Sequence, residues 1–279
     1  MLRHPARAPR RHAGLFMASL AALLLLPGVA GAQYSAPDSN QGAVGEKYHV
    51  EFSGSFWNPT VFGVVSSEQF RQLGSDIDVV KDLGFEPTRF GDMRIVLRPS
   101  KKSRFRVQYT PIRYEATSSL QRSIVFNGQR FDVALPIQSA VEWKVWRFGY
   151  EYDFLYLPRG FVGVLLEARY TQFTAELNSA INTEFTTARA PLPALGVVGR
   201  GYVLPNVAIN FEMTGFRLPE FDKRYEATYF DWDINGTVNV TNNVGLQVGW
   251  RKLTNFLRIE NDLGDLRFQG LWFGAAVRY

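Results

Sequence analysis

Histidine is scarce in this chain, and this limits the chemistry that the sequence can support. Of the three histidines among 279 residues, His4 and His12 lie close to the N-terminus. His49 is therefore the one histidine in the body of the chain that could act as a general base. Glu51 follows at a spacing that puts both side chains on one face of a strand, so we expect an ion pair there. The sequence predicts no catalytic residue.

Two pairs of carboxylates, Asp76/Asp78 and Asp231/Asp233, are the other candidates for acid–base chemistry or for a calcium site. The first pair falls in a polar loop and the second on one face of a strand, where solvation and ion pairing account for them. The chain has no cysteine, which excludes thiolate metal ligands and cysteine nucleophiles. We therefore expect neither a metal ion nor a cofactor.

A larger set of charged side chains alternates with aromatic side chains along the predicted strands. If the aromatic face points outward, the charged face points inward, where opposite charges must pair because an unpaired buried charge is costly. Together with His49 and Asp92, the set comprises Glu51, Arg94, Arg98, Arg104, Arg106, Arg147, Glu151, Asp153, Glu167, Arg169, Arg200, Glu212, Asp231, Asp233 and Arg251. An alternative is a narrow anion path along Arg94, Arg98, Arg104 and Arg106.

The segments that carry these residues are predicted to be β-strands, because side-chain character alternates at every second residue. The clearest runs from Trp146 to Tyr156, with aromatic residues at every second position and mainly charged ones between them. The same criterion predicts ten strands, at 46–59, 89–98, 103–117, 137–156, 160–176, 192–203, 206–217, 225–240, 243–257 and 265–279. Eight strands are the alternative, if the first strand or the segment 189–203 is miscounted.

Two kinds of connection alternate along the chain. Tight turns are expected at 99–102, 157–159, 204–205 and 241–243, and longer polar loops at 60–88, 118–136, 178–191, 218–224 and 258–264. An even number of strands, with tight turns at one end and long loops at the other, is typical of an antiparallel up-and-down transmembrane β-barrel. Both termini then lie at the end with the tight turns, which we expect to be periplasmic.

Three segments depart from the simple alternation. The apolar residues of Ser66–Gly84 are spaced more like a helix than a strand, which indicates a short helix in the first outer loop or a plug inside the barrel. Asn127-Gly128 is a favoured two-residue turn and predicts a small hairpin over 123–133 that extends the second outer loop. Pro111 interrupts the third strand, where we expect a bulge.

The N-terminus has the features of a secretory signal peptide over residues 1–32. Four arginines precede an apolar run from Leu15 to Leu26, and Ala30-Gly31-Ala32 is a small-residue cleavage signal. A polar linker at 33–45 and a barrel at 46–279 follow. Without the four leader arginines, 27 basic residues face 26 acidic ones, so the net charge falls from +5 to about +1. This balance argues against a nucleic-acid partner.

The last residues carry a recognisable pattern. Trp272, Gly274, Val277 and Tyr279 resemble the C-terminal signal read by the machinery that assembles barrels in the outer membrane. Together with the leader, the aromatic alternation and the sorted turns, they make residues 46–279 similar to the small bacterial outer-membrane β-barrels of the OmpA and OmpW type. No peptidoglycan-binding domain follows the last strand, so cell-wall tethering is not implied.

The resemblance implies an exported, integral outer-membrane protein without catalysis, with a structural role or an interaction at the cell surface. Its partners would be outer-membrane lipid and, during biogenesis, the barrel assembly machinery; the surface ligand is unknown. Two alternatives remain. One is a narrow channel for small solutes or ions, and the other is an outer-membrane protease or lipid A-modifying enzyme.

Overall fold

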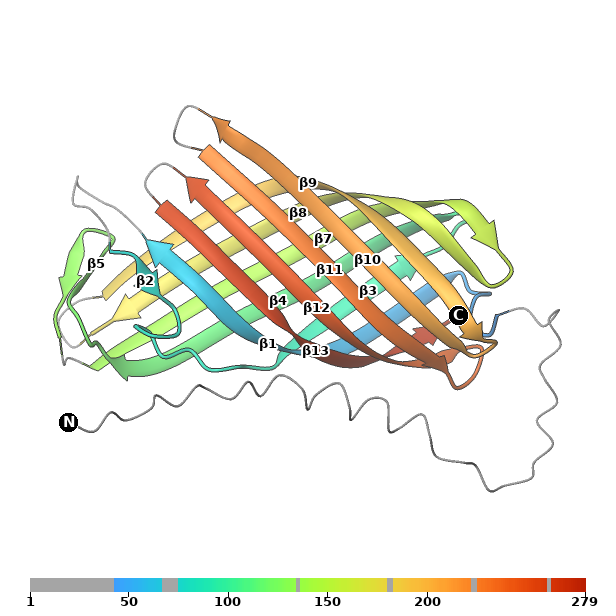
Figure 1. Ribbon diagram of the computed structural model, residues 1–279, viewed down its shortest axis with the longest axis horizontal. Helices are drawn as coiled ribbons and strands as arrows, with labels where there is room; N and C mark the ends of the chain where they lie inside the picture. The colour runs from blue at the N-terminus through green and yellow to red at the C-terminus, as the bar shows by residue number, and fades with distance from the viewer. Residues whose placement is uncertain (1–42, 67–74, 134–135, 180–182, 222–224, 260–261) are drawn as a thin grey trace, which may run out of the picture. The chain divides into compact units, whose positions relative to one another are not determined.

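Ten long antiparallel strands form a closed barrel in the computed structural model, which describes residues 43–66, 75–133, 136–179, 183–221, 225–259 and 262–279 (Figure 1). The last strand pairs with the first, from Glu51 opposite Arg278 to Ser66 opposite Leu263, so these strands leave no open edge. In order around the ring they are β1 (Val50–Ser66), β3 (Phe90–Leu97), β4 (Ser103–Ser119), β7 (Pro136–Leu157), β8 (Gly160–Asn178), β9 (Thr183–Leu204), β10 (Val207–Phe221), β11 (Tyr225–Asn239), β12 (Val244–Ile259) and β13 (Asp262–Arg278). The predicted fold class and the count of ten strands are confirmed.

Three short strands lie outside the ring of ten. β2 (Ile77–Asp78) pairs with the end of β1, and β5 (Ile124–Phe126) pairs with β6 (Gln129–Phe131). All three lie at the end of the barrel that we call the loop end; the opposite end, with the connections at 98–102, 158–159, 205–206 and 240–243, is the turn end (Figure 1). Among the described residues, no helix is long and apolar enough to cross a membrane.

The aromatic face points outward, as the alternation predicts. Phe154 is 55% exposed, whereas the neighbouring Asp153 is fully buried and Glu151 nearly so. A water-soluble sheet would bury its aromatic side chains and expose its carboxylates. The reversed arrangement is that of a barrel surrounded by hydrocarbon.

Most of the strands are much longer than a membrane requires. Nine of the ten have 15 to 22 residues, whereas about 9–11 residues cross a bilayer. Towards the loop end, the outward face of β7 changes from Trp146 and Phe148 to Lys144 and Glu142, which form an ion pair. The barrel therefore projects beyond its apolar band at this end.

The extra strand length shortens three connections that we expected to be long. β8 ends at Asn178 and β9 begins at Thr183, and the connections between β10 and β11 and between β12 and β13 are shorter still. The expectation of a long loop in each place was wrong because the polar residues there continue the ladder. Only the first two connections at this end carry additional strands in the part of the chain described here.

The bulge expected at Pro111 is absent. β4 and β7 pair without a shift from Ser103 opposite Tyr152 to Ser119 opposite Pro136, and Pro111 takes its place in that register. Ile112 and Tyr114 point inward, in step with the buried Thr110. The apolar residues of β4 lie outward before Pro111 and inward after it, because the interior itself changes from charged to apolar towards the loop end.

An apolar core fills the barrel at the loop end. It is closed by residues 75–85, which include β2, and by the β5–β6 hairpin; together we call these the plug. Their side chains at Ile77, Val79, Ile124 and Phe126 have no exposed surface. No helix occurs among the described residues of Ser66–Gly84, so the plug is the correct alternative there; residues 67–74 lie outside the described residues.

The hairpin at 123–133 forms around the expected turn. Asn127 and Gly128 both have positive φ angles, 49° and 77°, as a type I′ turn requires. The hairpin does not simply extend outward from the barrel, because Phe126 and Phe131 are buried in the apolar core.

Candidate functional site

Glu212 connects opposite walls of the barrel. It projects from β10, and its carboxylate accepts hydrogen bonds from Arg106 of β4, from Arg94 of β3 at 3.3 Å and from Arg147 of β7 at 2.7 Å. β3 lies five positions from β10 in the ring of ten, on the far side of the lumen. One carboxylate therefore bridges three guanidinium groups across the middle of the barrel.

A second centre surrounds Asp231 of β11. Arg251 of the neighbouring strand donates to it at 2.8 and 3.0 Å, and the Tyr229 hydroxyl donates at 2.8 Å. Arg147 approaches it at 3.5 Å from β7, which joins the two centres. Arg251 also lies 3.5 Å from Asp92 of β3, so this centre crosses the lumen as well.

The third centre lies nearer the turn end. The Nη1 atom of Arg104 lies 2.5 Å from both Glu151 and Asp153, which project from β7. Arg106 donates to the other oxygen of Glu151 at 3.1 Å and so links this centre to Glu212. The guanidinium of Arg104 also stacks over the Phe161 ring at 4.1 Å.

The segment Ala43–His49, which we call the strap, extends across the turn end. It runs from β1 to the turn between β9 and β10, where the Val44 N–H donates to the Pro205 carbonyl at 2.8 Å. Glu46 in the strap lies 2.6 Å from Arg200, 3.3 Å from Arg98 and 3.8 Å from Arg104. The strap therefore closes this end with a charge that matches the arginines beneath it.

The ionisation of Glu46 reflects these neighbours. Burial alone would raise the pKa of its carboxyl group. Arg200, which also hydrogen-bonds to it, together with Arg104 and Arg98, outweighs burial and holds the pKa below its ordinary value. The strap is thus held by an ionised carboxylate.

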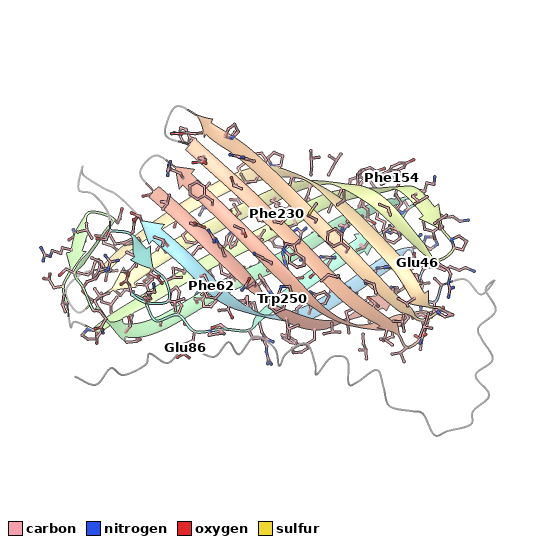
Figure 2. All side chains as sticks on the ribbon, in the orientation of Figure 1. Glu46, Phe62, Glu86, Phe154, Phe230 and Trp250 are labelled. Atoms are coloured by element: carbon pink, nitrogen blue, oxygen red, sulfur yellow. The ribbon has the colours of Figure 1, made fainter. Side chains whose placement is uncertain are left out.

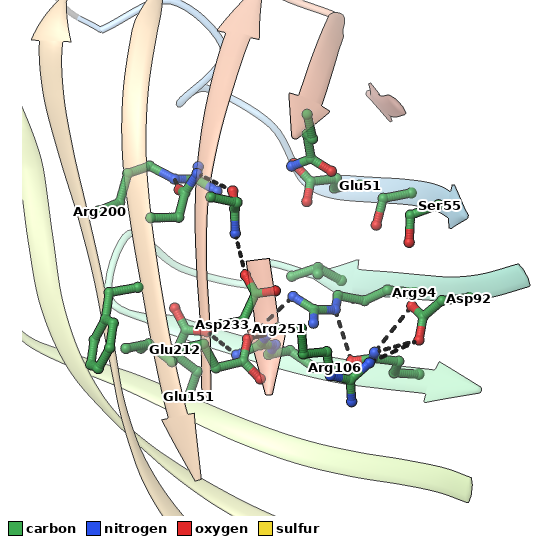
Figure 3. A pocket seen from close by; sticks show the side chains of 18 of the residues that line it. Glu51, Ser55, Asp92, Arg94, Arg106, Glu151, Arg200, Glu212, Asp233 and Arg251 are labelled. Atoms are coloured by element: carbon green, nitrogen blue, oxygen red, sulfur yellow. Dashed lines mark hydrogen bonds and ion pairs between the residues drawn. The ribbon is translucent and has the colours of Figure 1, made fainter. Parts of the chain in front are cut away.

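A cavity of about 110 Å³ lies between the strap and the apolar core (Figure 3). Six carboxylates and six arginines are among its lining residues, so its formal charge is balanced. The carboxylates are Glu51, Asp92, Glu151, Glu212, Asp231 and Asp233, and the arginines are Arg94, Arg104, Arg106, Arg147, Arg200 and Arg251. Within the described residues, no group of three or more histidine, cysteine or carboxylate side chains is arranged to hold a metal ion.

The fifteen charged residues selected from the sequence all project into the barrel. Most join the three centres or the strap; Glu167 binds Arg147 and Arg169, and Asp233 accepts from the Trp272 indole and from Asn235. Glu51 pairs instead with Arg278 at 2.5 Å. The prediction that His49 also faces the lumen was wrong, because His49 is exposed and lies at the turn end beside Tyr279.

Sequence reasoning missed three participants. Glu46 lies in the strap and not in the strand predicted over 46–59, and nothing local marks it as a partner of Arg200. Arg278 alternates with Val277 and Tyr279 and could have been placed inside from that pattern. Tyr229, whose ring lies 3.7 Å from the guanidinium carbon of Arg169, is two positions before Asp231 and could have been placed inside from the same alternation.

The terminal pattern is split between the two faces of β13. Val277 and Tyr279 point outward and are 54% and 90% exposed, whereas Trp272 points inward and donates to Asp233. Gly274 lies opposite Ser55 of β1, at the seam that closes the barrel. Recognition of these four residues by the assembly machinery stays a prediction.

Comparison with solved structures identifies the fold. The outer membrane protease OmpT from Escherichia coli superimposes with a TM-score of 0.53 over 82% of this chain and 96% of its own, at 10% identity. The alignment with Ail, the attachment invasion locus protein of Yersinia pestis, covers 83% of this chain and 99% of Ail, with a TM-score of 0.37 at 10% identity. No protein-family model and no curated protein matches the chain. The chain therefore has the fold of the outer-membrane β-barrel proteins, in a ten-stranded form.

Proposed function

We propose that this chain is an integral protein of the bacterial outer membrane with a closed lumen, and that it works through the part of the barrel that projects at the loop end. The observation that carries the proposal is the filling of the lumen at three levels. The strap closes the turn end, the ion pairs cross the middle, and the plug fills the loop end.

The outward surface supports a place in a membrane. Exposed aliphatic and aromatic side chains cover the barrel from the turn end towards the loop end, as at Phe154, Phe230 and Trp250 (Figure 2). The ring centroids of Tyr109 and Trp146 lie 4.5 Å apart, just before the outward face becomes charged, where an interfacial aromatic belt is expected. Together with the leader predicted at 1–32, this surface favours export and insertion into the outer membrane, with the turn end in the periplasm.

The filled lumen argues against conduction as the main activity. An ion crossing the barrel would have to separate the pairs that Glu212 and Asp231 make with opposite walls, and then displace an apolar core. Buried ion pairs are costly to break because one charge is left without a partner. The balanced lining also gives no preference for either sign of ion.

Conductance of the purified protein in planar bilayers tests this proposal. We expect no discrete openings at potentials where an open porin, reconstituted in the same way, conducts. Regular openings that Arg104→Ala weakens would show instead that the arginines line an ion path, and would replace a surface role by that of a channel.

We propose no catalytic role for His49. If the chain were a histidine-dependent enzyme, His49→Ala would abolish hydrolysis of lipid A or of exposed peptides by intact cells that express it. We expect the parent and the His49→Ala variant to give the same background in both assays.

A further inference from the structure

A second cavity, of about 50 Å³, lies inside the barrel at the loop end and is lined mainly by apolar side chains. Val65 of β1, Phe126 of the plug and Trp143 of β7 meet there with side chains of β8, β9, β12 and β13. The further lining residues are Ser66, Thr171, Phe173, Ala175, Leu192, Asn255, Leu257, Asp262, Leu263, Gly264 and Leu266.

The deep part of this cavity suits an apolar ligand. Val65, Phe126, Trp143 and Leu266 are almost completely buried, and the indole N–H of Trp143 is already used, because it donates to the Thr171 hydroxyl. A polar solute entering here would lose its hydrogen bonds to water without replacing them. An alkyl group would lose nothing and would gain contact with the walls.

The cavity has room for such a group at Gly264. A Cβ atom placed on this glycine would meet no other heavy atom within 4 Å, although the residue lies on the inward face of β13, two positions before the buried Leu266. A larger side chain there would fill the space, and an unfilled void costs stability in proportion to its volume. The glycine leaves open a space that the fold does not need.

The mouth of the cavity faces water at the loop end. Leu192, Leu257 and Leu263 are only partly buried, and Asp262 and Ser66 lie at the ends of their strands. At this level the outward faces of β12 and β13 carry charged residues, among them Arg258 and Arg267, so lipid does not cover the strands here. A ligand can therefore enter from outside the cell with its polar end left in water.

We propose that this cavity binds the end of an unbranched alkyl chain from a single-chain amphiphile. The volume of the cavity limits which apolar groups can enter it. An engineered cavity of about 150 Å³ accommodates benzene, so a cavity one third as large excludes a ring but accepts a narrow chain. This goes beyond the proposed surface role, because it names what the projecting half of the barrel takes up.

Photo-crosslinking in lipid nanodiscs tests the proposal, with a straight-chain ten-carbon alcohol that carries a diazirine near its methyl end. Mass spectrometry locates the attached label. We expect label on the inward residues Trp143, Phe173 and Leu266, in addition to label that outward residues acquire through the lipid. The outward label serves as an internal standard for the amount of probe in the membrane.

Gly264→Ile is the informative variant, because its side chain would occupy the cavity. We expect at least a tenfold loss of inward label relative to outward label. Gly236→Ile is the matched control: Gly236 lies on β11 among lipid-facing residues and also has open space at its Cβ position. Both variants should keep the shift in gel mobility on boiling that marks a folded barrel.

Competition in the unaltered protein keeps the test decisive if Gly264→Ile does not fold. Unlabelled 1-decanol should suppress the inward label, and a cyclic alcohol of equal carbon number should do so at least tenfold less well. Inward label that is absent, or that survives both Gly264→Ile and 1-decanol, would overturn the proposal. Neither result depends on whether the barrel conducts ions, so this test and the conductance test fail separately.

Discussion

Glu212 is the residue on which the centre of the lumen most depends, because three arginines from the opposite wall share its carboxylate. Each of these guanidinium groups also has a second acceptor: Gln108 for Arg94, Glu151 for Arg106 and Glu167 for Arg147. Glu212 is the group that holds the three together across the lumen. Without it, three like charges would face one another at close range in a poorly solvated space.

We expect Glu212→Ala to lower the free energy of unfolding by about 3–5 kcal/mol, the usual cost of removing one partner from a buried ion pair. Unfolding in urea with lipid vesicles, followed by tryptophan fluorescence, measures the loss. Glu115→Ala is the control, because its pair with Arg113 is exposed and should contribute less than about 1 kcal/mol. Equal effects of the two changes would contradict the bridging role of Glu212.

Asp82 and Arg122 hold the two parts of the plug together. Arg122 donates to the Asp82 carboxylate at 2.7 and 3.2 Å, and the Asp78 N–H donates to it at 2.9 Å. Burial would raise the pKa of Asp82, but these hydrogen bonds outweigh burial and lower it below its ordinary value. The ionised form is therefore the form that stabilises the plug.

A pH dependence of the plug follows from this lowered pKa. The contribution of Asp82 is complete above the ordinary carboxyl pKa of about 4, and it is lost as the pH falls through the lower folded value. We expect the amide protection factor of Leu83 to fall between pH 5 and pH 2. In Arg122→Gln this decrease should be much smaller, and an unchanged pH profile in that variant would refute the assignment.

The plug hairpin illustrates how elements here differ in stability. β5 and β6 have three residues each, and they pair with each other and not with the barrel strands. Their attachment therefore depends mainly on apolar side chains such as Ile124 and Phe131 in the core, whereas each barrel strand is hydrogen-bonded to a neighbouring strand on both sides.

We expect Ile124→Ala to release the hairpin without opening the barrel. Deleting a fully buried isoleucine side chain costs about 2–5 kcal/mol, which is large for so small an element. Limited proteolysis within 120–133 should become at least tenfold faster, while the mobility shift on boiling remains. Arg130→Ala, an exposed change in the same hairpin, should leave the cleavage rate unaltered, and faster cleavage there would weaken the argument.

At the scale of the whole molecule, the strap covers the central cavity at the turn end, where Glu46 pairs with the cavity-lining Arg200. The natural absence of cysteine allows this to be measured with one introduced thiol. Ser55 lines the cavity, so Ser55→Cys reports on access from the turn end.

We expect a small water-soluble methanethiosulfonate to modify Ser55→Cys at least tenfold faster when Glu46→Ala is added, because the strap then loses its contacts with Arg200, Arg98 and Arg104. Lys47→Ala changes an exposed neighbour in the same segment and should not alter the rate. Modification at the same rate in all three proteins would show that the strap does not control access.

The sequence alone determined the class of this protein and most of its barrel. Period-two alternation and turn residues are local properties, and they place Phe154 outside and Asp153 inside without knowledge of the partner strands. The same alternation predicted ten strands, because each strand must separately cross the membrane. The prediction of a bulge at Pro111 was wrong, because the alternation continues through Pro111 while the interior changes from charged to apolar.

Only the closed structure decided which groups meet across the lumen. Glu212 binds Arg94, 118 positions earlier in the chain, because closing the ring of ten strands brings opposite walls within reach. No pattern within a strand specifies such a contact, since every inward position is equivalent until the diameter and stagger of the barrel are fixed. The plug and the strap were decided in the same way, because each needs the complete barrel as its binding surface.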